Sequence, residues 1–180
     1  MVLPETQSAP PDACCRGDRE ALHSLFLAHK DSVYSVALRF TADASAASDI
    51  TQDVFLKLFS RIGTFRGESR IETWLYRITI NCCLDHRRRS ARFVPLVDDQ
   101  RTSAESTPAE QAEAAEVGRR LQAAVVALPE DLRTVIVLRY TEDLSYEEIA
   151  EVLECAAGTV ASRLNRAHKR LAELLGGRND

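Results

Sequence analysis

The segment 69–89 most constrains what this chain can fold into, because its apolar residues follow the period of a helix. It opens with the sequence Ser69-Arg-Ile-Glu72, which is typical of a capping box that satisfies free amide groups at a helix start. Apolar residues then recur every three or four positions, at Ile71, Trp74, Leu75, Ile78 and Cys82. The pattern predicts a helix with one buried stripe.

The other faces of this predicted helix are basic and hydrogen-bonding. They carry Arg70, Arg77, Arg87, Arg88 and Arg89, together with Thr73, Tyr76 and Asn81. Arginine neutralises phosphate, planar groups stack on bases, and an amide reads a base edge, so this surface suits a nucleic-acid strand. A plain amphipathic helix with a solvated arginine-rich end that complements the helix dipole would show the same pattern. The segment alone leaves both interpretations open.

Charge is segregated along the sequence, although the formal net charge is only -4. Residues 57–92 contain nine basic and three acidic side chains, whereas residues 98–116 contain six acidic side chains and one basic one. A basic face is therefore retained within an acidic protein. With 45% hydrophobic and 28% charged residues and few Gly or Pro, the composition favours a soluble, helix-rich protein.

No apolar run approaches the ~18 residues of a membrane span, and no segment resembles a signal peptide. We therefore expect a cytoplasmic protein that is not inserted in a membrane. Its five cysteines, an odd number, are expected to be reduced thiols there. The group Cys82, Cys83, Asp85 and His86 suggests a metal site, but adjacent helical residues point about 100° apart and no second ligand pair has zinc-like spacing. For these cysteines we favour ordinary thiols over a metal-binding or redox-sensing role.

Residues 18–90 are predicted to form one compact helical domain after a disordered tail at 1–17. Asp18 is placed to cap a first helix, whose apolar positions continue at the same period to Phe40. A polar turn then leads to a second helix at about 46–62. Its inward positions are Ile50, Val54, Phe55, Leu58, Phe59 and Ile62, and its opposite face carries Asp49, Gln52, Asp53, Lys57 and Arg61.

Residues 91–106 break the helical pattern and are predicted to form a flexible acidic linker. A second capping box, at residues 107–110, begins a second helical domain at 107–176. Its first helix carries an apolar stripe, and Pro129 separates that helix from the next. The stripe consists of Val117, Leu121, Val125 and Leu128.

A third capping box, at residues 145–148, opens a short helix that is followed by a tight turn and a longer basic helix. This order is typical of a helix-turn-helix, whose second helix enters the major groove by its N-terminal end. The outward side chains of that helix are Thr159, Ser162, Arg163, Arg166, Lys169 and Arg170. The first three are placed for bases and the others for phosphates. A helical hairpin with a solvated basic face is the alternative.

Two sets of motifs resemble the two DNA-binding domains of a bacterial RNA polymerase sigma factor. The first set is Gln-Asp-Val-Phe at 52–55, Phe-Arg-Gly-Glu-Ser at 65–69, Trp-Leu-Tyr-Arg-Ile at 74–78, Asn81 and the arginine run. The second set is Leu-Pro-Glu-Asp-Leu-Arg at 128–133, Leu-Arg-Tyr at 138–140, Ser-Tyr-Glu-Glu-Ile-Ala at 145–150 and Gly-Thr-Val at 158–160 with its continuation to Ala167. Over roughly residues 18–175, the chain is similar to the extracytoplasmic-function (ECF) group of sigma factors.

The resemblance implies an all-α protein of two small helical domains joined by a linker, the second containing the helix-turn-helix. Core RNA polymerase would bind Asp49, Gln52, Asp53, Leu56 and Lys57. The melted -10 promoter element would bind Phe65, Arg66, Glu68, Ser69, Arg70, Thr73, Trp74, Arg77, Asn81, Arg87 and Arg88. The duplex -35 element would bind the six outward residues of the helix-turn-helix. The resemblance further implies a separate anti-sigma factor, no cofactor and no catalytic residue.

Three positions of the helix-turn-helix depart from the family pattern, as do Cys82 and Cys83, which replace the usual small or polar residues beside Asn81. Glu154 stands where Gly is usual, so a residue with a side chain is asked to take an awkward backbone conformation. Ala156 removes a candidate N-cap, and Ala161 replaces a frequent lysine that would contact phosphate. We expect weaker binding of the upstream element.

The linker is short for its implied task. As a coil its residues span only ~22 Å, whereas the two promoter elements lie roughly two duplex turns, or ~70 Å, apart. We therefore expect free protein to bind promoters poorly and polymerase to set the spacing of the domains.

Two other classes of function are compatible with parts of the sequence. A helix-turn-helix regulator that works without polymerase would leave the basic surface of the first domain without a task. An enzyme using His86 with Cys82 or Cys83 would lack a phosphate-binding loop, a metal-spaced cluster and a paired acid and base. Binding of core polymerase separates the first alternative from a sigma factor.

Overall fold

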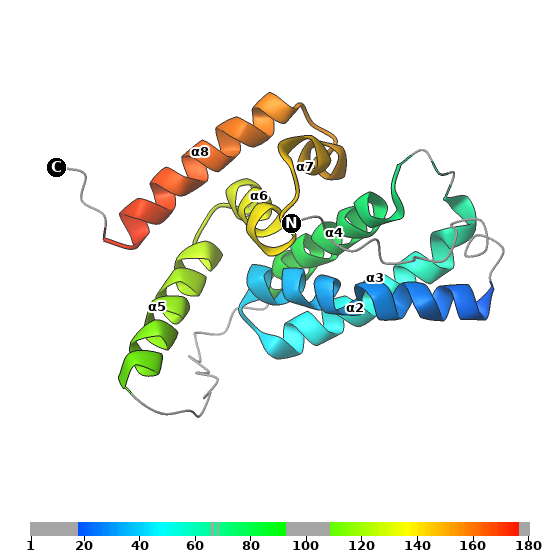
Figure 1. The fold of residues 1–180 in the computed structure, drawn as a ribbon, viewed down its shortest axis with the longest axis horizontal. Coiled ribbons are helices and arrows are strands. Elements are labelled where there is room, and N and C mark those ends of the chain that lie inside the picture. Colours follow the sequence, from blue (N-terminus) through cyan, green and yellow to red (C-terminus); the bar gives the residue numbers. More distant parts are fainter. Residues whose placement is uncertain (1–17, 66, 68, 93–108, 177–180) are drawn as a thin grey trace.

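The described part of the chain consists of helices joined by short turns and contains no strand, which confirms the all-α prediction (Figure 1). The computed structural model describes residues 18–65, 67, 69–92 and 109–176, so the predicted tail and most of the predicted linker lie outside it. Its elements are α2 (Arg19–Thr41), α3 (Ala44–Arg61), the 3-10 turn η1 (Ile62–Thr64), α4 (Ile71–Arg92), α5 (Ala109–Val126), α6 (Glu130–Thr141), α7 (Tyr146–Leu153) and α8 (Ala157–Leu174).

Side-chain caps fix several of the helix starts. Asp18 accepts hydrogen bonds from the amides of residues 20 and 21, as predicted, and Asp43 caps α3 through the amide of Ala46. The capping box of Ser145 and Glu148 at α7 is confirmed. The one predicted for α4 is displaced, because the Trp74 amide donates to the Arg70 carbonyl at 3.2 Å and Arg70 therefore occupies the N-cap position. The box at 107–110 includes residues outside the described ranges.

The capping box of α7 should make the stability of the protein depend on pH. The backbone amide of Ser145 donates to the Glu148 carboxylate and holds the pKa of that carboxyl below its usual value. The stabilisation is therefore present above the ordinary glutamate pKa of ~4.3 and is lost as the pH falls through the lowered one. Between about pH 6 and pH 3, the melting temperature of the wild type should fall more than that of Glu148→Gln. Circular dichroism melting would measure this, and parallel curves would contradict it.

The helices α2, α3 and α4 form an N-terminal bundle in which α2 and α3 pair and α4 packs against both (Figure 1). Most of the apolar positions predicted to face inward are buried, whereas Leu22, Phe26, Phe59 and Trp74 are half-buried. They include Leu25, Val33, Val36, Ala37 and Phe40 on α2, and Ile50, Val54, Phe55 and Leu58 on α3. The Phe26 and Phe55 rings meet edge to face at 4.8 Å, a favourable arrangement for aromatic pairs. The bundle thus presents α3 and α4 on a rigid base.

The helices α5, α6, α7 and α8 form a C-terminal bundle around α6. Every residue from 132 to 138 is buried, which is typical of a helix enclosed on all sides. The apolar stripe predicted on α5 was only half right, because Val117 and Leu121 are 59% and 45% exposed. Among the residues of α5 whose burial is described (115–126), the buried ones, Ala124 and Val125, lie at the C-terminal end, and Leu128 just beyond the helix is buried too. The opposite end of α5 points away from the other helices (Figure 1).

The turn between α7 and α8 has the two unusual features that the sequence predicted. Glu154 has a positive φ of 51°, the left-handed conformation that glycine adopts without strain. Ala156 is the N-cap of α8 and makes no side-chain capping bond. The helix-turn-helix is therefore complete but starts its second helix without a side-chain cap.

The two bundles pack together instead of standing apart. Helix α6 lies against α2, α7 lies against α4, and one continuous cluster of buried apolar residues runs through both bundles. Arg133 on α6 ties them together. Its guanidinium donates to the carbonyl of Phe40 at 3.1 Å, to that of Leu128 at 3.1 Å and to that of Val126, and it lies 5.1 Å from the centroid of the Phe40 ring. Burial lowers the pKa of Arg133 to about 10, so the side chain stays charged at neutral pH.

Candidate polymerase and nucleic-acid interfaces

The outer face of α3 places the predicted polymerase-binding residues on one surface. Asp49, Gln52 and Leu56 are exposed, and Leu56 is 68% exposed, more than any other large apolar side chain in the described residues. Asp53 pairs with Arg89 at 3.7 Å and Lys57 with Asp85 at 3.8 Å. Both of these ion pairs are with α4 of the same bundle, and the charged residues Asp53 and Lys57 flank the exposed leucine. Such a surface suits a protein partner.

The predicted strand-binding residues lie around the N-terminal half of α4 and the loop before it. The rings of Phe65 and Trp74 pack against each other with their centroids 5.3 Å apart and their planes tilted by 33°, and both side chains are half-buried. The exposed residues Arg70 and Asn81 lie on the same helix or at its start, and Ser69 is half-buried. Arg66 and Glu68 are outside the described residues. The loop and helix thus combine an aromatic platform with cations and an amide, the groups that bind single-stranded nucleic acid.

Two residues that the sequence placed on the outer faces of α4 are buried. Thr73 is 5% exposed and Tyr76 is 7% exposed. Helix α4 is packed against α2 and α3 of its own bundle and also against α7 of the other bundle. Fewer of its faces therefore reach solvent than if the two bundles were apart. The Tyr76 hydroxyl donates a hydrogen bond of 2.5 Å to Glu142 on the C-terminal bundle. Burial, then the nearby Glu142 carboxylate, raises the pKa of Tyr76, and burial also raises the pKa of Glu142.

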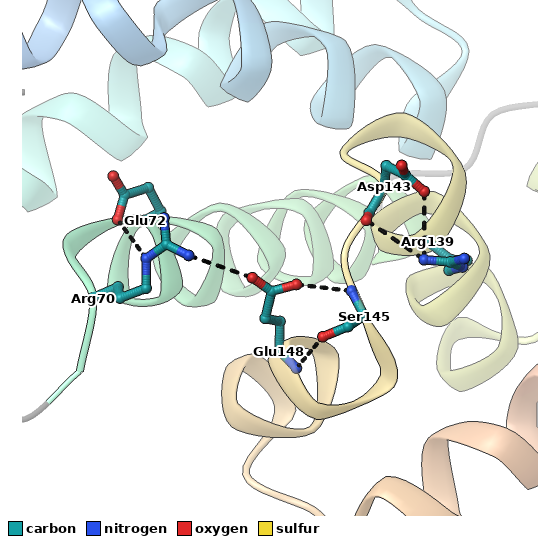
Figure 2. Close-up of polar contacts among 6 residues, drawn as sticks. All are labelled: Arg70, Glu72, Arg139, Asp143, Ser145 and Glu148. Atoms are coloured by element: carbon teal, nitrogen blue, oxygen red, sulfur yellow. Dashed lines mark hydrogen bonds and ion pairs between the residues drawn. The ribbon is translucent and has the colours of Figure 1, made fainter. Parts of the chain in front are cut away.

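Several arginines of the predicted strand-binding surface are paired with the C-terminal bundle, which the sequence did not predict. Arg77 forms an ion pair with Glu154 at 2.7 Å and donates to the Glu151 carbonyl at 2.8 Å. Arg70 contacts the Glu148 carboxylate at 3.4 Å (Figure 2). At the far end of α4, Arg87 lies 3.6 Å from Glu130. The sequence marks only the carboxylates of these pairs, Glu148, Glu154 and Glu130, because Glu151 takes part through its backbone carbonyl.

The predicted -35 residues lie along one side of α8. Ser162, Arg166, Lys169 and Arg170 are exposed, and Thr159 and Arg163 are half-buried. Arg163 and Arg166 both lie 4.0 Å from the Asp131 carboxylate of α6, and Arg170 pairs with Glu173 at 2.7 Å. The helix therefore carries small polar groups near its start and cations farther along, as a recognition helix requires.

The cysteines of α4 are structural in character. Cys82 and Cys83 are free and buried. Burial raises the pKa of Cys83 to about 12, and it also raises the pKa of Cys82 although Lys57 donates to that sulfur at 3.3 Å. Protonated thiols are poor nucleophiles and poor metal ligands. Among the described residues, no three His, Cys, Asp or Glu side chains are grouped so that they could hold a metal ion.

Comparison with known proteins identifies both bundles. Residues 25–93 match Sigma-70 region 2, and residues 118–171 match Sigma-70, region 4. The chain is 36% identical to the RNA polymerase sigma-H factor of Pseudomonas aeruginosa over 97% of this chain and 96% of that protein. It is 33% identical to the ECF RNA polymerase sigma-E factor of Haemophilus influenzae over 92% and 93% of the two chains. The chain belongs to the ECF group of RNA polymerase sigma factors.

Solved structures show the same fold for this sigma factor. The structure of CnrH in complex with the cytosolic domain of CnrY is 23% identical, has a TM-score of 0.72, and covers 95% of this chain and 97% of that one. The sigma factor RpoE in complex with the anti-sigma factor NepR from Bartonella quintana is 25% identical with a TM-score of 0.69, and the match covers 87% of this chain and 97% of that one.

Among the described residues, none of the helices combines the length and the hydropathy that a membrane-spanning segment needs. The protein is an alternative sigma factor that works with RNA polymerase.

Proposed function

We propose that three surfaces divide the work of promoter recognition. The outer face of α3 binds core RNA polymerase, the loop and helix around Trp74 bind the -10 element as single strand, and α8 binds the -35 element as duplex. The observation that carries this assignment is that regions 2 and 4 match in order while each surface has the chemistry of its partner. Melting turns a base out of the stack, which takes a few kcal/mol. The aromatic pair and the cations offset that cost.

The proposed function also implies a protein inhibitor and a place of action. An anti-sigma factor is expected to hold the protein inactive, since the RpoE structure is a complex with an anti-sigma factor. We expect the protein to act in the cytoplasm because polymerase and promoters are there. Catalysis of RNA synthesis then belongs to the polymerase and not to this chain.

Transcription by purified core enzyme tests the proposal. A promoter library would be transcribed in three reactions: with core enzyme alone, with core enzyme plus the wild-type protein, and with core enzyme plus Asn81→Ala. Specific transcripts should appear only in the two reactions that contain the protein. Asn81→Ala removes an exposed amide aimed at base edges, so transcripts should fall about 5-fold to 100-fold while core binding is unchanged. A matched variant on the same helix, Ser90→Ala, should behave as wild type. Sequence-specific duplex binding without core, and no transcript with it, would indicate a polymerase-independent regulator.

A further inference from the structure

A cavity of about 320 Å³ lies where the ends of several helices meet, and no residue of α7 lines it in the described part of the chain. Its walls come from the C-terminal parts of α2, α4 and α5, the N-terminal end of α3 and the first turn of α6. The cavity is open to solvent, and its volume is at the lower end of the range for small-molecule sites. Both bundles therefore contribute to one pocket.

Two arginines that line this cavity have buried donors without an acceptor. Arg133 is 3% exposed, and its two Nη atoms donate to three backbone carbonyls, whereas its buried Nε has no hydrogen-bond partner. The buried Nη1 of Arg87 has none either, because the Glu130 carboxylate lies 3.6 Å from it, beyond hydrogen-bond reach. Among the described residues, four buried side-chain atoms are of this kind, and two of the four belong to this one cavity. Such donors are costly to bury, so the cavity is suited to an acceptor that both can reach.

The two guanidinium groups are also close enough to repel each other. Burial, and then the positive charge of Arg87, lowers the pKa of Arg133 to about 10, while Glu130 opposes this effect. The half-buried His86 lines the same cavity and adds a ring nitrogen to it. An oxyanion between the arginines would replace their repulsion by charge-assisted hydrogen bonds.

The remaining walls indicate what else a ligand would carry. Phe40, Ala46 and Val126 are apolar, and the acidic Asp43 uses one carboxylate oxygen to accept from the Ala46 amide at 2.9 Å. The other oxygen of Asp43 can accept from a ligand hydroxyl and would repel a second anionic group. A bare phosphate ion would fill only a small part of the 320 Å³.

We propose that this cavity binds a small phosphate monoester with a hydroxylated body, such as a sugar phosphate. Nε of Arg133 and Nη1 of Arg87 donate to the phosphate oxygens, because the guanidinium group matches the geometry of phosphate. Asp43 accepts from a hydroxyl of the body. Since the walls belong to both bundles, the ligand binds the packed arrangement of the bundles and stabilises it by mass action.

Ribose 5-phosphate is a suitable probe, with ribose and inorganic phosphate as its two halves. At 10 mM, ribose 5-phosphate should raise the melting temperature of the full chain by about 3–6 °C if its dissociation constant is about 1 mM. Ribose should give no shift, and inorganic phosphate should give a smaller one, each compared with sodium chloride at the same ionic strength. Differential scanning fluorimetry would measure the shifts, and isothermal titration calorimetry would measure the affinity.

Three variants locate the site. Arg87→Gln removes one of the two donors and should lower the affinity at least 10-fold. Arg88→Gln makes the same charge change at the next position, on a side chain that is 66% exposed, and should stay within about 2-fold of the wild type. Glu130→Gln removes the same ion pair as Arg87→Gln but keeps the cation, so its affinity should be equal to that of the wild type or higher. Circular dichroism would establish that all three variants keep their helices.

The wild-type comparison is decisive without any variant. If ribose 5-phosphate shifted the melting temperature no more than sodium chloride does, the cavity would hold only water and the proposal would be wrong. Equal losses of affinity for Arg87→Gln and Arg88→Gln would point to general charge attraction and would also overturn it, as would a loss for Glu130→Gln as large as that for Arg87→Gln. These measurements concern ligand binding by the free protein, so their failure would leave the proposed polymerase and promoter surfaces untouched.

Discussion

Replacing Leu56 by arginine is expected to lower the affinity for core RNA polymerase by about 100-fold. Leu56 is 68% exposed at the centre of the α3 face, between Asp53 and Lys57. Buried apolar anchors at the centre of an interface contribute most of its binding energy, and a charge there leaves an unpaired group without water. Biolayer interferometry with immobilised core enzyme would measure the change.

A matched leucine on the neighbouring helix provides the control. Leu27 on α2 is 51% exposed and lies outside the predicted polymerase-binding set. Leu27→Arg makes the same chemical change and should alter core affinity by less than about 2-fold. Both variants should melt at the wild-type temperature because both leucines already face solvent. Equal losses for the two variants would show that α3 is not the polymerase-binding face.

Replacing Arg133 by alanine is expected to lower the stability of the protein by about 3 kcal/mol. The side chain is 3% exposed and donates to carbonyls at the ends of both α2 and α5. Without it these acceptors remain buried and unpaired. For a chain of this size the melting temperature should fall by about 6–12 °C, measured by scanning calorimetry of the full chain.

Two further variants isolate the cause of that loss. Arg133→Met keeps most of the length and apolar stem, so it should recover little if the hydrogen bonds are what matters. Arg120→Ala removes an exposed arginine of α5 and should change stability by less than about 0.5 kcal/mol. A wild-type melting temperature for Arg133→Met would mean that Arg133 acts through packing alone.

The helices could be predicted from the sequence because each is encoded locally. The features that were predicted correctly all depend on residues within a few positions of one another. They are the apolar period of α2 and α3, the cap at Asp18, the capping box at residues 145–148 and the left-handed conformation of Glu154. The displaced start of α4 shows the limit of such patterns. Ser69 and Arg70 are adjacent, and a motif does not decide which of them ends the loop.

The packing of one bundle on the other could not be predicted in the same way. Its contacts join residues more than forty positions apart, such as Tyr76 with Glu142 and Arg77 with Glu154. Each of these side chains, considered alone, is typical of a solvated helix face. The burial of Arg133 was also missed. Arg133 lies in the first turn of α6, after Pro129, and resembles an exposed residue until its acceptors, the carbonyls of Phe40 and Leu128, are known. The division into region 2 and region 4 needed only the motifs.

The free α3 face and the engaged α4 face together impose an order of assembly. A newly synthesised molecule in the closed form exposes Leu56 and its neighbours while Arg70 and Arg77 are paired internally. Under the proposed assignment of these two faces, the surface for polymerase is accessible in the closed form, whereas the arginines proposed to bind the strand have internal partners. Binding of polymerase would then precede binding of the strand.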